Sequence, residues 1–241
     1  IVGYTMYFAT QAGAPFLLAA GLGITFAAIA SLLMQLALFR PLRGASFVTL
    51  LFASFALSQA LQGVFRQAIS PRARGIAVPE IFSTFVTIGD IRIGFLTIAT
   101  LIIALTSMGI LAVFMRYSRS GLQMRAAAID LTTTRLMGVR ANRVILGAFA
   151  ISGILAGIAG VLWMARTTQV TPTSGFTPIL IAFIAVVLGG LGSIPGAVIG
   201  GYIFGVLEVF LQAYLPIGLV PFQFAMALIA VSVLLYLRPE G

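Results

Sequence analysis

The uncharged run VILGAFAISGILAGIAGVLWMA, Val144–Ala165, decides the fold class of this sequence. An α-helix rises about 1.5 Å per residue, so about 20 apolar residues cross the roughly 30 Å hydrocarbon core of a bilayer. The three glycines Gly153, Gly157 and Gly160 form a small-residue stripe, which is typical of helix–helix contacts in membranes. The run therefore predicts a transmembrane helix that packs closely against a neighbour.

Composition extends this prediction to the whole chain. Of 241 residues, 61% are apolar and 8% are charged, and the mean hydropathy is +1.15. A soluble domain is about half apolar and about a quarter charged, so this chain lacks the polar surface that would cover a soluble core. The absence of Cys and His excludes a disulfide framework, a thiol nucleophile, a Ser-His-Asp triad and an ordinary zinc site. We expect a membrane protein that is not an enzyme and binds no cofactor itself.

Hydropathy predicts an all-α, polytopic bundle of about seven helical segments in a single transmembrane domain over residues 1–241. The predicted segments are Ala14–Phe39, Ala45–Phe65, Phe95–Met115, Val144–Ala165, Ile179–Leu191, Gly196–Leu215 and Phe222–Leu237. The apolar start, Ile1–Ala9, lacks the basic flank and cleavage site of a signal peptide, so we expect it to be the end of a helix that is truncated here.

Arginines predict how the spans are oriented. All basic residues are Arg, and most lie between long apolar runs, which does not favour a nucleic-acid partner despite the net charge of +9. Placing the arginine-rich segment 116–143 in the cytoplasm brings Arg40, Arg43 and Arg238 to the same side by alternation. Residues 66–94 then form an external loop, in which β-branched runs such as Phe85–Ile88 predict a small hairpin.

The stretch 179–215 is too long for one span, and small residues interrupt it. We predict one broken or re-entrant helix, with the break at Gly189, Gly190, Gly192, Ser193, Pro195 and Gly196. Two interpretations remain open. Small residues four apart allow close helix packing, whereas a broken helix that lines a cavity offers backbone groups to a polar solute.

Polar side chains within two predicted spans are candidates for the translocation path. Ser58, Gln59 and Gln62 make the second full span less apolar than the others. Glu208 is the sole acid in an apolar span, so its carboxyl should be protonated, paired, or turned to the bundle interior or a wet cavity. It either senses the path or hydrogen-bonds a neighbouring helix.

The polar segment RYSRSGLQMRAAAIDLTTTRLMGVRANRV, Arg116–Val144, carries the most specific information. Its helix formers and the stop at Gly138 predict one short helix over Gly121–Leu136. Such a helix either lies on the membrane with its arginines on anionic headgroups or docks a cytosolic partner. Asp130 has a local interpretation as well, because it can cap a helix or pair with Arg125 or Arg135.

The same segment resembles the permease subunits of branched-chain amino acid ABC importers, a group that also includes ribose and other simple-sugar permeases. The resemblance is dense from Tyr117 to Glu208. It rests on YSRSG-LQMRA-AAID, Gly138-Val139, Asn142-Arg143, GAFAISGILAGIAGVL, VLGGLGSIPGAVIGG and Gly205-Val206-Leu207-Glu208.

This resemblance implies a permease subunit in a bacterial or archaeal inner membrane that moves branched-chain amino acids or similar small polar solutes inward. It implies three kinds of protein partner: a second similar permease, two cytosolic ATPases that hold ATP and Mg, and a soluble substrate-binding protein. Membrane lipid is a further partner, expected from the apolar composition. The chain itself has no GxxxxGK[ST] loop for ATP. An alternative from the residues alone is a proton-coupled secondary transporter in which Glu208 loads and releases the proton.

The resemblance also maps the ATPase-coupling helix to about Arg125 through Gly138, a range that contains Arg135. Asp130 stands at the family's acidic position. The family usually has a small residue shortly after this acid, whereas this chain has Thr132, Thr133 and Thr134. The details of the ATPase contact therefore stay open.

Overall fold

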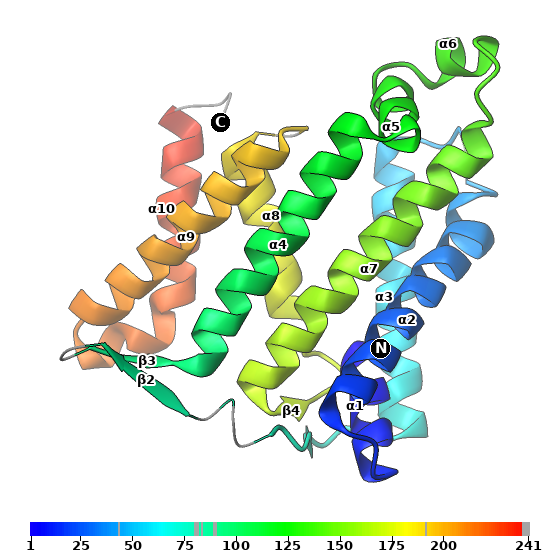
Figure 1. Cartoon of the computed structure of the whole chain (residues 1–241). Helices are drawn as coiled ribbons and strands as arrows, with labels where there is room; N and C mark the ends of the chain where they lie inside the picture. The colour runs from blue at the N-terminus through cyan, green and yellow to red at the C-terminus, as the bar shows by residue number, and fades with distance from the viewer. Residues whose placement is uncertain (43, 80–81, 83, 89–90, 191, 238–241) are drawn as a thin grey trace. The chain divides into compact units, whose positions relative to one another are not determined.

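The computed structural model describes the chain except residues 43, 80–81, 83, 89–90, 191 and 238–241, and it is mainly helical (Figure 1). A first compact unit covers residues 1–172 and a second covers residues 173–241. The first unit contains the helices α1 (Val2–Gln11), α2 (Phe16–Met34), α3 (Phe47–Ala68), α4 (Phe95–Tyr117), α5 (Arg119–Ile129), α6 (Leu131–Leu136) and α7 (Ala141–Thr167). The second contains α8 (Phe176–Gly189), α9 (Ile194–Tyr214) and α10 (Gln223–Leu237), with the 3-10 helix η3 (Ile217–Phe222) between the last two.

The predicted all-α, polytopic membrane fold is confirmed. Within the described residues, 5 helices are long and apolar enough to cross a membrane: α2 with its continuation to Phe39, α3, α4, α7 and α9. The seven predicted segments all appear as helices, but α8 has 14 residues and spans only about 21 Å. The break that follows it also lies where the sequence predicted, because α8 ends at Gly189 and α9 begins at Ile194.

Helices α2 and α7 form the centre of the first unit, and small residues let their backbones approach. A Cβ on Gly153 would lie 2.8 Å from the Cα of Ala28, and one on Gly157 would lie 2.9 Å from the Cα of Ile24. The Ser31 hydroxyl donates a hydrogen bond of 2.7 Å to the carbonyl oxygen of Phe149 in the same seam. The small-residue stripe predicted from the sequence is therefore a helix interface, with Gly160 packed on α1 through Val2.

The last turn of α2 departs from regular α-helix. Residues Gln35–Phe39 form a π-helix, η1, in which the Arg40 amide donates to the Gln35 carbonyl oxygen at 2.8 Å. The Gln35 side chain is fully buried at 0% exposure, and neither of its amide atoms has a hydrogen-bond partner. A buried amide without a hydrogen-bond partner is unfavourable, so the Gln35 side chain destabilises this end of the α2–α7 interface.

Two small antiparallel ladders lie at one end of the first unit. Strands β2 (Phe85–Ile88) and β3 (Ile91–Gly94) pair with each other, which confirms the predicted hairpin. Strands β1 (Arg74–Gly75) and β4 (Gln169–Val170) pair across a long stretch of sequence, with Arg74 opposite Val170. The second ladder joins the loop after α3 to the end of α7.

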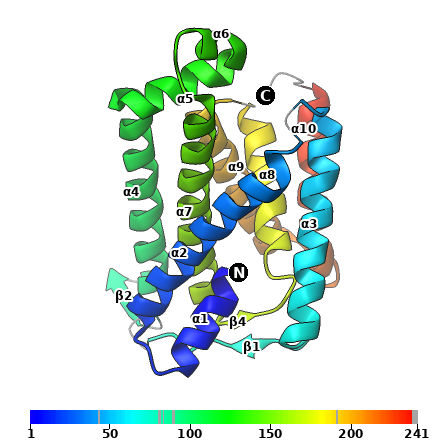
Figure 2. The same ribbon diagram turned by 90° about the vertical axis from the view of Figure 1, so that its right-hand side faces the viewer.

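The two ends of the first unit carry different elements. Helices α5 and α6 lie at one end, where α2 also finishes and α3 starts, whereas the ladders lie at the other end (Figure 2). Arg40 thus shares an end with the α5–α6 segment, as the predicted alternation requires. The side of the membrane that each end faces stays a prediction.

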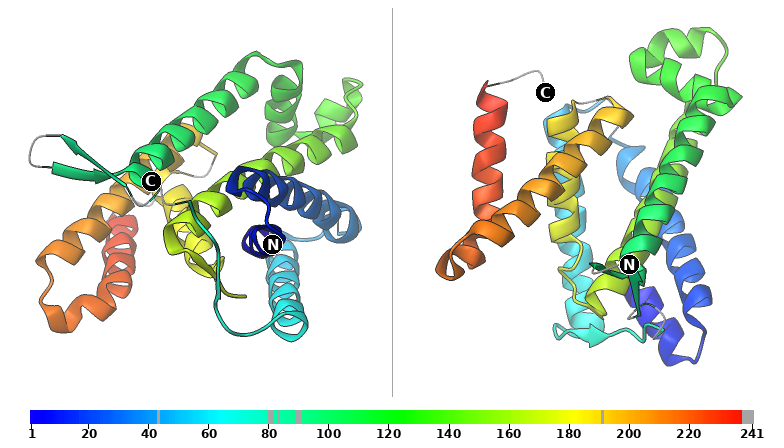
Figure 3. Two further views of the ribbon diagram at one scale, coloured as in Figure 1. Left: turned by 60° about the horizontal axis from the view of Figure 1, so that its bottom comes forward. Right: turned by 60° about the vertical axis from the view of Figure 1, so that its left-hand side comes forward.

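Glycines bring α8 and α9 into backbone contact within the second unit. Gly196 lies against Gly189, and a Cβ on Gly200 would meet the Ala185 carbonyl oxygen and lie 2.8 Å from the Gly189 nitrogen. Helix α10 returns beside α9 (Figure 3) and completes a small core of Ile184, Phe204, Ala227 and Val231.

Candidate functional site

The α4–α5 corner positions the polar segment that the sequence singled out. Ser118 ends α4, and its hydroxyl caps α5 by accepting a 2.9 Å hydrogen bond from the Gly121 amide. Gly121 is buried against the end of α4, so that a Cβ there would lie 2.5 Å from the Phe114 carbonyl oxygen and 2.7 Å from the Met115 Cα. No larger residue fits this turn without moving the backbone.

Helix α5 also rests on α7. A Cβ on Gly147 of α7 would lie 2.8 Å from the terminal methyl of Met124, so this glycine receives the methionine side chain. The corner and this contact together fix α5 to two long helices. A short element held in this way can transmit a displacement to the helices that flank it.

The single helix expected over Gly121–Leu136 is wrong: the segment forms two helices, α5 and α6, that break at Asp130. The Asp130 backbone is extended, with φ −148° and ψ 107°. Its Oδ1 accepts hydrogen bonds from the amides of Thr132 at 2.8 Å and Thr133 at 3.2 Å, and its Oδ2 accepts one from the Thr133 hydroxyl. Asp130 caps α6, because its carboxylate satisfies amides that have no partner in the first turn of a helix.

These hydrogen bonds also stabilise the ionised form of Asp130. The Thr133 hydroxyl contributes most, followed by the amides of Thr133 and Thr132, and together they hold the pKa of this carboxyl below its ordinary value of 3.8. The group is therefore ionised at neutral pH. The local interpretation of Asp130 as a cap is confirmed, while a direct role in ATPase contact stays a prediction.

Helix α6 contains one buried threonine and ends in a glycine turn. Thr134 is buried and donates a 2.7 Å hydrogen bond to the Asp130 carbonyl oxygen. The Gly138 amide donates to the Arg135 carbonyl oxygen at 3.0 Å, and Gly138 has a φ of +82°, a left-handed conformation that favours glycine. The predicted stop at Gly138 therefore marks the end of α6.

Three apolar side chains stand exposed around this anchored turn. Ile129 is 90% exposed, Leu136 is 83% exposed and Met137 is 80% exposed. We call these three residues the coupling surface, after the role that the sequence predicts for this segment. Apolar side chains on a polar, helix-capped loop far from the long apolar runs are typical of a protein–protein contact.

The other residues of the proposed coupling helix are also accessible. Arg135 is exposed in the last turn of α6. Arg125 is exposed on α5, where its Nη2 donates to the carbonyl oxygen of Arg116 at 3.5 Å. It therefore lies toward the α4–α5 corner rather than on α6.

The path residues expected on α3 share the half of this helix that is remote from α5 and α6. Ser58 and Gln59 are exposed, and Gln62 is half-buried, with its Nε2 donating to the Ser58 hydroxyl at 3.3 Å. The structure places all three on one helix. Their place in a path stays a prediction.

The break residues between α8 and α9 have separate structural roles. Gly190 and Gly192 have φ values of +86° and +102°. The Ser193 hydroxyl caps α9 through the Gly196 amide at 3.1 Å, and Pro195 stands in the first turn. Gly189 and Gly196 form the close backbone crossing, so packing accounts for these two glycines without a ligand.

Glu208 lies half-buried on α9 beside the start of α10. The Gln223 side-chain amide donates to the Glu208 carbonyl oxygen at 2.9 Å, which ties α10 to α9. This interhelical bond was not expected from the sequence, which pointed to the carboxyl and not to the backbone of Glu208.

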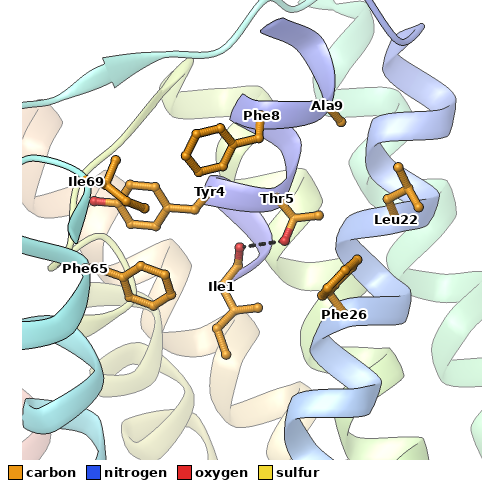
Figure 4. Close-up of a pocket in the computed structure, with 9 residues that line it drawn as sticks. All are labelled: Ile1, Tyr4, Thr5, Phe8, Ala9, Leu22, Phe26, Phe65 and Ile69. Atoms are coloured by element: carbon orange, nitrogen blue, oxygen red, sulfur yellow. Dashed lines mark hydrogen bonds between the residues drawn. The ribbon is translucent and has the colours of Figure 1, made fainter. Parts of the chain in front are cut away.

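A cavity in the first unit lies between α1, α2 and α3 (Figure 4). It measures about 510 Å³ and is lined mainly by apolar side chains, among them Phe8, Leu22, Phe26 and Phe65. The Thr5 hydroxyl in its wall donates to the Ile1 carbonyl oxygen at 3.2 Å. This lining offers little to the charged ends of an amino acid, so we do not assign the substrate to it.

Sequence reasoning missed several residues of the site. Gly121 is buried because it packs against the end of α4, and the contact of Met124 with Gly147 joins α5 to α7; neither contact follows from a local pattern. The break at Asp130 did have a signal, because an Asp followed by threonines is a common start of a helix.

Comparison with known proteins agrees with this architecture. The family model described as "Branched-chain amino acid transport system / permease component" matches residues 1–237. The high-affinity branched-chain amino acid transport system permease protein LivH of Escherichia coli K12 is 36% identical over 182 residues, which are 73% of this chain and 58% of that protein. The probable LivH of Methanocaldococcus jannaschii is 29% identical over 223 residues, covering 89% of this chain and 70% of that protein.

A more distant similarity reaches sugar permeases. The ribose import permease protein RbsC of Escherichia coli K12 is 34% identical over 100 residues, 39% of this chain and 31% of that protein. No solved structure matches the chain. The matched region spans 58% of the length of the enterobacterial LivH proteins. On the family model, which covers almost the whole sequence, this chain belongs to the branched-chain amino acid transport system permease family.

Proposed function

We propose that the chain is a permease subunit of an ATP-binding-cassette importer in a bacterial or archaeal plasma membrane. It moves branched-chain amino acids or similar small polar solutes inward. ATP and Mg are held by two cytosolic ATPase subunits, a second similar permease completes the membrane part, and a soluble binding protein delivers the solute. Family membership supports the transport role, and the named substrates of the LivH relatives support the substrate class.

The observation that carries the proposal is the coupling surface on an anchored two-helix segment. Ile129, Leu136 and Met137 are exposed, while Gly121 packs on α4 and Met124 packs on Gly147 of α7, which fixes α5 to the two long helices. In this proposal the coupling surface enters a groove of the ATPase, and closure of the ATPase pair moves α4 and α7 through α5. The segment acts as a mechanical lever with two positions and performs no chemistry.

The solute path in this proposal includes the polar side of α3. Ser58, Gln59 and Gln62 supply hydroxyl and amide groups for a zwitterion, which needs hydrogen-bond partners when it leaves water. The half-buried Glu208 and the α8–α9 break are the other path candidates, although their backbone contacts are explained by packing.

The test replaces Ile129 by Arg and measures both ATPase binding and uptake in proteoliposomes. A charge at the centre of an apolar contact should weaken assembly at least about tenfold, as expected for a buried interface anchor. Phe85→Arg is the matched control, because Phe85 is also an exposed apolar residue but lies on β2 at the other end of the first unit. Normal assembly and uptake of the Ile129 variant would contradict the coupling role.

A second arm separates the importer from a proton-coupled transporter. Uptake should stop when the ATPases are omitted and should persist with a proton ionophore. The reverse result would favour the alternative in which Glu208 carries a proton.

A further inference from the structure

Three arginines gather at the α4–α5 corner. Arg116 lies in the last turn of α4, and Arg119 is the first residue of α5. Arg125, two turns further on, reaches back so that its Nη2 lies 3.5 Å from the Arg116 carbonyl oxygen. The guanidinium carbon of Arg116 lies 5.5 Å from the centre of the Tyr117 ring, which orients this side chain at the corner.

No acidic residue neutralises this group in the described part of the first unit. Asp130 is the only acid there, and its carboxylate is bound by the amides of Thr132 and Thr133 and by the Thr133 hydroxyl. Like charges on one short segment repel each other, and an anion bound between them removes the repulsion. The arrangement therefore favours a ligand with an oxygen-rich negative charge.

The corner lies at the level where a bilayer ends. Helix α4 has 23 residues and is about 34 Å long, so it matches the thickness of the hydrocarbon core. None of its residues is buried, and Leu101, Leu105, Ile110 and Val113 are exposed along its length. Tyr117 is the last residue of α4 and is 74% exposed. Tyrosine is enriched at the membrane–water boundary.

We propose that Arg116, Arg119 and Arg125 bind the phosphate of an anionic phospholipid, with Tyr117 lying against its glycerol region. Guanidinium groups form paired hydrogen bonds to phosphate oxygens, which a single ammonium does not. The α4–α5 corner is then a lipid site, while the coupling surface around α6 faces protein. In this arrangement the α4–α5 corner contacts lipid and α6 contacts the protein partner. Arg125, which the sequence assigned to the ATPase contact, belongs to the lipid site.

This proposal does not depend on the ATPase, so it is tested on the purified permease alone. The triple variant Arg116→Gln, Arg119→Gln, Arg125→Gln is reconstituted in nanodiscs of phosphatidylcholine with and without phosphatidylglycerol. The control triple variant, Arg66→Gln, Arg72→Gln, Arg166→Gln, removes the same charge from exposed arginines at the other end of the first unit. Retained phosphatidylglycerol is counted by native mass spectrometry, and the melting temperature is measured in both lipids.

The unmodified permease and the control variant should retain phosphatidylglycerol and melt at a higher temperature in its presence. The corner variant should lose both effects, with lipid affinity falling about fivefold for each arginine removed. Equal retention in the corner variant would overturn the proposal, as would an equal loss in the control. If the purified corner variant retains lipid unchanged and a separate assay with the ATPase shows weaker binding, the arginines contact protein instead and the lipid site is wrong.

Two single changes keep the test decisive if the triple variant does not fold. Arg119→Gln alone should lower lipid retention, because Arg119 is exposed and makes no hydrogen bond in the described structure through its side chain. Arg119→Lys keeps the charge but loses the paired geometry, and should retain more lipid than the Gln variant and less than the unmodified chain. Equal retention by all three proteins would refute a role for Arg119.

Discussion

Replacing Gly200 by Ala tests whether the α8–α9 crossing is as tight as the structure requires. The new Cβ would meet the Ala185 carbonyl oxygen, lie 2.8 Å from the Gly189 nitrogen and lie 3.1 Å from the Leu188 Cβ. Two of these three neighbours are backbone atoms, which cannot rotate away. Overpacking of this kind costs about 1–3 kcal/mol, and we expect the upper half of that range because the helices themselves must separate.

Gly205→Ala is the matched control on the same helix. A Cβ at Gly205 meets nothing within 4 Å, and Ala in a helix is more favourable than Gly by about 0.5–1 kcal/mol. Thermal unfolding in detergent should therefore show a lower melting temperature for the Gly200 variant and an unchanged or higher one for the Gly205 variant. The reasoning fails if the two variants melt together, because the close approach would then not limit the packing.

Three further predictions concern the first unit. Gln35→Met should raise the melting temperature by several degrees, because two buried amide atoms without hydrogen-bond partners cost the native protein about 1–3 kcal/mol. The control Gln62→Met should not raise it, because the Gln62 amide has a hydrogen-bond partner. Gly121→Ala should disturb the α4–α5 corner and lower uptake, while Gly109→Ala on α4, with open space around its Cβ, should leave uptake unchanged. Asp130→Ala should lower the hydrogen-exchange protection of the amides at the start of α6. In the unmodified protein the cap should be intact above pH 3.8 and be lost as the pH falls through the lowered pKa of Asp130. Protection factors, corrected for the intrinsic pH dependence of exchange, that stay constant in acid would contradict this prediction.

The spans were predictable because a bilayer imposes their length and composition. An uncharged run such as Val144–Ala165 has few alternatives to a membrane helix, and α7 extends it by only a few residues at each end. The break before α9 was also predictable, since Gly190 and Gly192 can adopt positive φ values that other residues avoid. Both features depend on local sequence alone.

Other features depend on contacts that no local pattern records. The π-helix at Gln35 changes the hydrogen-bond register but leaves hydropathy unchanged, so no count of apolar residues can detect it. The helix formers before Asp130 give way to threonines after it, but composition alone did not show that a second helix follows; the Asp130 cap decides where α6 starts. The sequence did not predict that Ile129, Leu136 and Met137 are exposed, because apolar residues between helices are often buried. Their exposure depends on how the rest of the segment folds.

The β1–β4 ladder has a consequence for the order in which the chain is made. It joins Arg74 and Gly75 to residues that are synthesised after α7, and Ile76 adds a hydrogen bond of 2.9 Å to the Thr168 carbonyl oxygen. Gly3 on α1 packs against Met164 and Val170, so α1 also contacts this later-synthesised segment. During translation the first unit therefore enters the bilayer as an open assembly, and it closes only when residue 170 has left the ribosome.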